Sequence, residues 1–168
     1  MEAKVKDIAG LTFNPLYLGL VAGTTSTYTT TVAGRAVING KFGASLGAQT
    51  NTASPTTDAA TGAAFVPVLL NQATVLVWGL NAAGAIKLAQ GSIVATNPGV
   101  TTTVGDFGQN LPDFPALPDD FAPIGYQLVR VSPTGATFTA GTTQWAASGI
   151  TCSTIQNVSA LPDRPQAS

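Results

Sequence analysis

The chain contains no histidine and only one cysteine, Cys152. The missing imidazoles exclude Ser–His–Asp and Cys–His nucleophilic schemes and histidine-ligated metals. A single cysteine can form neither an intramolecular disulfide nor a structural zinc site. Because Cys152 stands in an alternating stretch, we expect it to be a small buried hydrophobe on a strand. The sequence therefore predicts a protein that is not an enzyme and that needs no cofactor or metal.

Charged residues are also scarce. They make up 9% of the 168 residues, with a formal net charge of −1, whereas an ordinary soluble domain contains roughly 25%. No charge occurs between Asp7 and Arg35 or between Arg130 and Asp163. Such a surface repels its own copies little, and its neutral polar groups cost less to desolvate than Lys or Glu. This composition favours a protein that works inside an assembly, and the lack of a basic patch argues against nucleic acid as a partner.

No apolar run approaches the roughly 20 residues of a membrane span, so we expect no membrane partner. Residues 8–22 imitate the core of a signal peptide, but Asp7 stands beside them and Pro15 interrupts them. We therefore expect residues 1–26 to form an extended arm with aromatic anchors, and residues 27–168 to form the folded domain.

Helical spacing of apolar residues is absent, whereas strands and turns are well marked. Asn39-Gly40 is a strong hairpin signal, because both central residues of a type I′ turn need positive φ. Residues 73–80 are apolar at nearly every position, which is typical of a strand covered on both faces. The other expected strands are 27–32, 35–38, 41–46, 85–94, 124–131, 136–140 and 150–158. Short strands with turn signals between them predict an all-β fold, a single β-sandwich or jelly roll.

Two segments after the arm have no strand pattern. Residues 47–62 are a loop rich in Thr, Ala and Ser. Residues 105–123 contain four prolines interleaved with Phe107, Phe114 and Phe121. Since proline cannot donate to a ladder, this loop should be extended and irregular. Its phenylalanines favour burial, either clamped onto the chain's own domain or docked on a neighbour.

The same loop also carries four aspartates, Asp106, Asp113, Asp119 and Asp120. Paired carboxylates can cleave a glycosidic bond, and with loop carbonyls they can bind calcium. We favour the simpler interpretation that they cap turns beside proline and keep an aromatic loop soluble. Trp78 and Trp145 could form a sugar-stacking platform, but packing in a core or interface is the more common role of tryptophan.

Three segments resemble small structural proteins of tailed phages: AVINGKFG (36–43), PALPDDFAPIGYQLVRV (115–131) and ALPDRP (160–165). The likeness is to capsid decoration, or cement, proteins with a β-sandwich or jelly-roll body, and it spans most of residues 30–165. The resemblance implies a virion protein on the outer capsid surface that bridges major capsid subunits. It also implies association with copies of itself, as a homotrimer or alternatively a dimer.

On this interpretation, the arm and the proline- and phenylalanine-rich loop contact other chains. The expected interface residues are Leu11, Phe13, Tyr17 and Leu18 in the arm, and Phe107, Phe114 and Phe121 in the loop. Removing residues 1–26 should then abolish decoration and leave a folded domain. Two other functions stay open: another virion component, such as a tail, fibre or head spike, and a carbohydrate-binding or adhesin module.

Overall fold

The computed structural model describes residues 11–108 and 110–166, and in that part of the chain it contains strands and loops but no helix. The all-β prediction is confirmed. A search of the described residues for a helix long and apolar enough to cross a membrane found none. The strands are β1 (Leu20–Ala22), β2 (Thr27–Thr30), β3 (Val37–Ile38), β4 (Lys41–Phe42), β5 (Gln49–Ala53), β6 (Gln72–Leu80), β7 (Ile86–Ala95), β8 (Ala122–Val131), β9 (Ile150–Cys152) and β10 (Gln156–Asn157).

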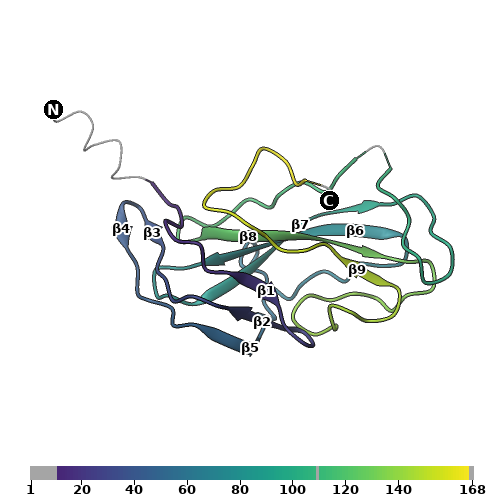
Figure 1. Ribbon diagram of the computed structural model, residues 1–168. Helices are drawn as coiled ribbons and strands as arrows, with labels where there is room; N and C mark the ends of the chain where they lie inside the picture. Colours follow the sequence, from purple (N-terminus) through teal and green to yellow (C-terminus); the bar gives the residue numbers. More distant parts are fainter. Residues whose placement is uncertain (1–10, 109, 167–168) are drawn as a thin grey trace.

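The larger sheet is built around β6, which pairs antiparallel with β7 on one side and β8 on the other. Both β9 and β10 pair with the free side of β8, so five strands form this sheet (Figure 1). Every residue of β6 from Ala73 to Leu80 is buried. This confirms the prediction, made from its continuous apolar sequence, that both faces of the strand are covered.

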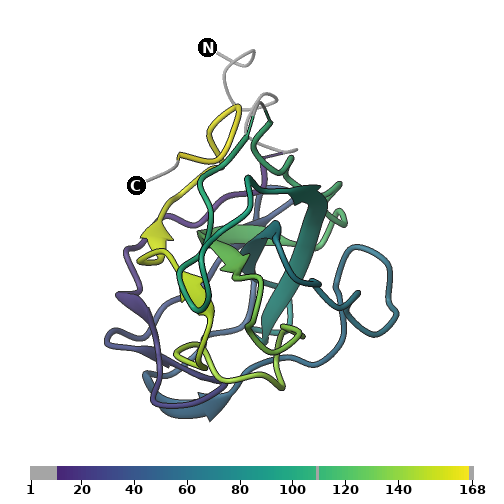
Figure 2. The ribbon, with the colours of Figure 1, turned by 90° about the vertical axis from the view of Figure 1, so that its right-hand side faces the viewer.

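One face of the larger sheet packs against the smaller sheet, in the order β1-β2-β5. Leu20 of β1, Tyr28 of β2, and Trp78 of β6 belong to one buried cluster, and the Tyr28 and Trp78 rings lie 5.6 Å apart. Trp145 also packs against Trp78, with ring centroids 5.9 Å apart. The two sheets therefore lie on opposite sides of one apolar core (Figure 2).

The other face of the larger sheet is covered by the proline- and phenylalanine-rich loop. Phe121 is buried, and Phe107 and Phe114 are half-buried against the same sheet residues. Phe114 meets Tyr126 of β8 edge to face, with ring centroids 5.2 Å apart. The sequence left open whether these phenylalanines pack on the chain's own domain or on a neighbour. In the structure they pack on the chain's own sheet.

The turn predicted at Asn39-Gly40 is confirmed by backbone angles. Asn39 and Gly40 have φ of 49° and 74°, as a type I′ turn between β3 and β4 requires. Gly84, in the turn between β6 and β7, has a φ of 73°. These two turns lie at the same end of the molecule, because Ala44, just after β4, donates its N–H to the carbonyl of Ala82 at 2.8 Å.

Two strands lie where none was predicted. β1 falls within the segment assigned to the arm, and β5 falls within the loop 47–62. No side chain of β5 is fully buried, so the strand needs no apolar residue at alternate positions. Its sequence, QTNTA, therefore lacks the alternation by which a strand is recognised. Leu18 and Leu20 are in the main core, so the folded part of the chain begins before residue 27.

The C-terminal strand predictions were too long. Residues 150–158 contain two short strands, β9 and β10, separated by Ser153 to Ile155. In place of a strand at 136–140, the structure has one isolated bridge, between Val68 and Phe138.

Candidate interaction surface

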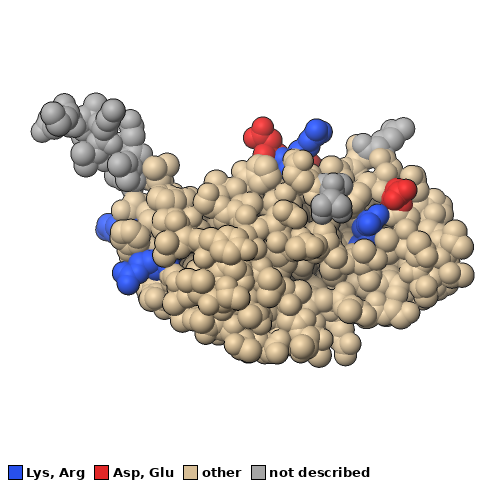
Figure 3. All heavy atoms as spheres, viewed as in Figure 1, with Lys and Arg blue, Asp and Glu red and all other residues tan. Residues whose placement is uncertain are grey.

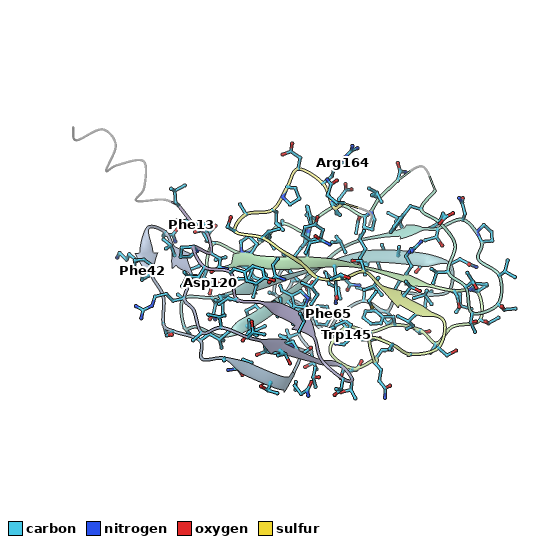
Figure 4. All side chains as sticks on the ribbon, in the orientation of Figure 1. Phe13, Phe42, Phe65, Asp120, Trp145 and Arg164 are labelled. Atoms are coloured by element: carbon cyan, nitrogen blue, oxygen red, sulfur yellow. The ribbon has the colours of Figure 1, made fainter. Side chains whose placement is uncertain are left out.

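The first described residues, 11–13, run alongside the β3–β4 hairpin. Phe13 exchanges two backbone hydrogen bonds with Val37, each 2.9 Å long, and the Leu11 carbonyl accepts one from the N–H of Gly40 at 2.9 Å. This part of the chain thus adds an edge to the hairpin. Figure 4 shows Phe13 and Phe42 together at this end of the molecule.

Four large apolar side chains are exposed on this hairpin, on residue 11 beside it, and on residues 16–17, which follow the segment 11–13. The exposed fraction is 71% for Tyr17 and 68% for Phe42, and about half for Leu16 and Leu11. We call Leu11, Leu16, Tyr17 and Phe42 the arm-end patch. Single exposed apolar residues are normal on soluble proteins, but a group of this kind marks an interaction site.

The arm-end patch contains two hollows on either side of Leu16. One, of about 350 Å³, is lined by Pro15, Leu16, Arg35 and Phe42. The other, of about 220 Å³, lies beside Tyr17 and reaches Ile124 of β8. Each hollow is large enough to receive an apolar side chain from a partner.

Two cations border this patch, Arg35 and Lys41, and both are exposed. The Arg35 guanidinium lies 5.9 Å from the centroid of the Phe42 ring, within the range of a cation–π contact. On the face shown in Figure 3, positive side chains stand at this end of the molecule, and no negative side chain of the described residues is visible beside them. On this face the patch is therefore apolar with a positive border.

A second exposed apolar group lies at the opposite end of β6. It consists of Leu69, Leu70 and Val100, and we call it the far-end patch. Asn71 joins the two segments, since its side-chain oxygen accepts a hydrogen bond from the N–H of Gly99. β6 is nine residues long, which corresponds to roughly 26 Å from its first to its last residue at the usual rise along a strand.

The structure separates the predicted interface residues into two groups. Tyr17 and Leu11 are exposed in the arm-end patch, and Phe13 is half-buried against the hairpin. In contrast, Leu18 and Phe121 are only 1% and 3% exposed, so they have almost no surface to offer another chain. Phe107 and Phe114 are partly buried against the chain's own sheet.

Sequence reasoning missed Leu16, Phe42 and the whole far-end patch. Phe42 follows directly after the Asn39-Gly40 turn, in a strand that pairs on one side only. A large aromatic residue beside a hairpin tip was a usable signal, because such a tip has little core to enter. The far-end patch lies on loops, where apolar residues carry no periodicity.

The other candidate sites do not assemble. In the described part of the chain, His, Cys, Asp and Glu nowhere form a group of three that could hold a metal ion. Asp106 instead pairs with Arg130 at 3.7 Å, and the Arg130 guanidinium lies over the Phe107 ring. Trp78 and Trp145 are buried, which confirms their predicted packing in the core.

Cys152 lies in β9, where it is partly buried, and its thiol donates to the carbonyl of Trp145 at 3.4 Å. Burial raises the pKa of this thiol from 9.0 to about 12, because a thiolate would lose its hydration there. It therefore stays neutral at physiological pH and is not an activated nucleophile.

No protein-family model matches the chain, and comparisons with curated proteins and with solved structures gave no match.

Proposed function

We propose that this chain is a virion structural protein that decorates the outer capsid surface and cements it by bridging major capsid subunits. Its body is a single β-sandwich or jelly roll, and it acts by binding alone, without catalysis or a cofactor. The shared core between the β1-β2-β5 sheet and the five-stranded sheet supports this body plan. Its partners are the major capsid protein and copies of itself, as a homotrimer or alternatively a dimer.

The observation that carries this proposal is the pair of exposed apolar patches at the two ends of β6. A bridging protein needs two separate contact surfaces, and the arm-end and far-end patches lie at opposite ends of β6, a strand roughly 26 Å long. An enzyme or a single-ligand module would need one concave site instead. Two patches on opposite ends can touch two neighbouring subunits at the same time.

Weak individual contacts are sufficient for this function. A contact at one patch buries less than the roughly 1,600 Å² of a standard interface, so alone it would be transient. Engaging the second patch becomes an intramolecular event with a high effective concentration, and a symmetric shell repeats the arrangement many times. The low charge of the chain suits such contacts, because few ions must be desolvated.

Binding of the purified protein to undecorated capsids tests the proposal. We expect Phe42→Ser and Leu69→Ser each to reduce binding at least tenfold, because each removes an exposed apolar anchor from a different patch. Ala116→Ser is the control, since Ala116 is exposed but lies in the proline- and phenylalanine-rich loop and in neither patch. Equal binding by all variants would overturn the proposal. Point substitutions are a better test than removing residues 1–26, because that truncation would also remove the core residues Leu18 and Leu20.

Two alternative functions use the same surfaces. In a tail, fibre or head spike, the protein would be present in a few copies per particle, whereas shell decoration requires hundreds, so copy number from mass spectrometry of purified particles separates them. A carbohydrate-binding or adhesin module is favoured only by the exposed rings of Tyr17 and Phe42, since sugars stack on aromatic faces. A glycan array without hits would remove it.

A further inference from the structure

The edges of the two sheets differ in how they are covered. Beside β1, the Asn157 side chain takes the place of a neighbouring strand. Its oxygen accepts from the N–H of Leu20 at 2.8 Å, and its amide donates to the Leu20 carbonyl at 2.9 Å. Asn157 belongs to β10 of the five-stranded sheet, and Leu20 belongs to β1 of the three-stranded sheet. This contact therefore joins the edges of the two sheets on one side of the molecule.

The edge of β7 is covered by the chain between β5 and β6. Ala59 donates its N–H to the Leu88 carbonyl at 2.8 Å, and the Asp58 carboxylate accepts from the N–H of Gln90 at 3.1 Å. The Gln90 side chain forms two further hydrogen bonds with the backbone of Val66, each 2.9 Å long. An approaching strand therefore finds few free backbone groups along β7.

β5 has no such cover. It is the terminal strand of its sheet, and among the described residues only β2 shares a β-ladder with it. Figures 1 and 2 both show β5 at the lower margin of the molecule. Proteins usually protect an open edge with charge, proline, a bulge or a covering segment. Of these devices, β5 has only a bulge, at Asn51.

We infer that β5 pairs antiparallel with β5 of a second copy of this chain, about a two-fold axis. The inference names a surface for the dimeric form of the self-association in the proposed function and rests on that part of it. In a two-fold interface residue i of one copy contacts residue j of the other and j contacts i, so a charge near the axis would lie close to the same charge on the second copy. Residues 42–57 contain no charged residue, which leaves this edge free of such repulsion.

The side chains of β5 also suit pairing with themselves. Gln49, Thr50, Asn51 and Thr52 each contain both a hydrogen-bond donor and an acceptor. Any of them can therefore bond to any other, in whichever register two copies pair, which two Lys or two Asp residues cannot do. A second copy presents the same neutral donors and acceptors, so this edge is compatible with its own copy as the occupant.

A five-residue edge makes a small interface, so we expect association that depends on concentration, with a dissociation constant between about 1 µM and about 1 mM. Sedimentation velocity of the pure protein across this range tests the inference. Thr50 is exposed and stands next to the middle residue of β5, so Thr50→Lys and Thr50→Glu each place two like charges close to the proposed axis. Each should weaken association at least tenfold. A 1:1 mixture of the two variants should restore it, because opposite charges then meet.

Thr134→Lys is the matched control, since Thr134 is equally an exposed threonine but lies in the turn after β8. It should leave association unchanged, and thermal unfolding of all variants should match that of the natural chain. A natural chain that stays monomeric at about 1 mM overturns the inference, as does a mixture that fails to reassociate. No capsid is present in this experiment, so its failure is distinct from failure of the capsid-binding test.

Discussion

Gln127 offers a test of how the core is held together. It lies in β8 directly across from Leu76, on the face that packs against the smaller sheet, and it is 0% exposed. Among the described residues, neither its amide nitrogen nor its amide oxygen has a hydrogen-bond partner. Folding therefore removes a polar amide from water without replacing its hydrogen bonds.

The size of this effect follows from the two unpaired atoms. A buried polar group without a partner costs about 1–3 kcal/mol, and Gln127 has two such groups. Methionine has a similar shape and volume, so Gln127→Met removes the penalty and creates no large cavity, although an imperfect fit can cost up to about 1.5 kcal/mol. The two groups together cost about 2–6 kcal/mol, so after that loss we expect the free energy of unfolding to rise by at least about 0.5 kcal/mol, which corresponds to at least about 1 °C in Tm for a chain of this length.

Urea and thermal unfolding, followed by tryptophan fluorescence, measure this change, because Trp78 and Trp145 are both buried in the core. Gln90→Met is the matched control. Gln90 is also buried, but its side chain forms two hydrogen bonds of 2.9 Å with the backbone of Val66. The same substitution should therefore lower the free energy of unfolding there, by about 1–2 kcal/mol.

The opposite signs of the two variants make the prediction strict. A Gln127→Met protein that is less stable than the natural chain would mean that the amide is hydrogen-bonded after all. Equal losses at Gln127 and Gln90 would mean that shape, and not hydrogen bonding, decides the stability of both sites. Either result would refute the reasoning.

Three further predictions concern other parts of the fold. The Asp58 carboxylate accepts three hydrogen bonds of 2.8–3.1 Å, so Asp58→Ala should lower the free energy of unfolding by about 2–4 kcal/mol and speed amide exchange in β7. A Cβ at Gly79 would overlap the buried Phe121 ring, so Gly79→Ala should cost about 1–3 kcal/mol in urea unfolding, whereas Gly47→Ala, with open space around it, should not. The rise in the pKa of Cys152 from 9.0 to about 12 lowers its thiolate fraction at pH 8 about a thousandfold, so iodoacetamide should label it rapidly only in urea. Because the pKa of Cys152 is higher in the folded than in the unfolded chain, the stability gained by burying the neutral thiol is complete below pH 9 and is lost as the pH rises toward 12. Rapid labelling of the folded protein would contradict the raised pKa.

The parts of the fold that were predictable from sequence are those with a local physical signal. Asn39-Gly40 fixes a turn through the φ values that its two residues tolerate, and the apolar run of β6 can be satisfied only by cover on both faces. β5 had no signal of this kind, because it is a strand only through its pairing with β2, and its own sequence has no strand pattern. Its polar sequence is equally compatible with a loop.

The candidate surface was only partly predictable for a related reason. An apolar residue in an irregular segment can be a core residue or an interface residue, and the sequence does not distinguish them. Tyr17 and Leu18 are adjacent, yet one is 71% exposed and the other is in the main core. What separates them is the position of β1 against β2, a pairing that places Leu18 and Leu20 inside.

The distribution of charge gives the molecule two unlike sides. The segment 42–57 and the segment 11–34 contain no charged residue, and together they provide β1, β2 and β5. The loop that covers the opposite side carries four aspartates, all exposed. Charges that remain hydrated stabilise a surface in water, whereas a neutral surface can be covered by a neighbour at lower desolvation cost. If the chain binds a shell as proposed, its aspartate-rich loop should therefore face the solvent and its three-stranded sheet should face other protein.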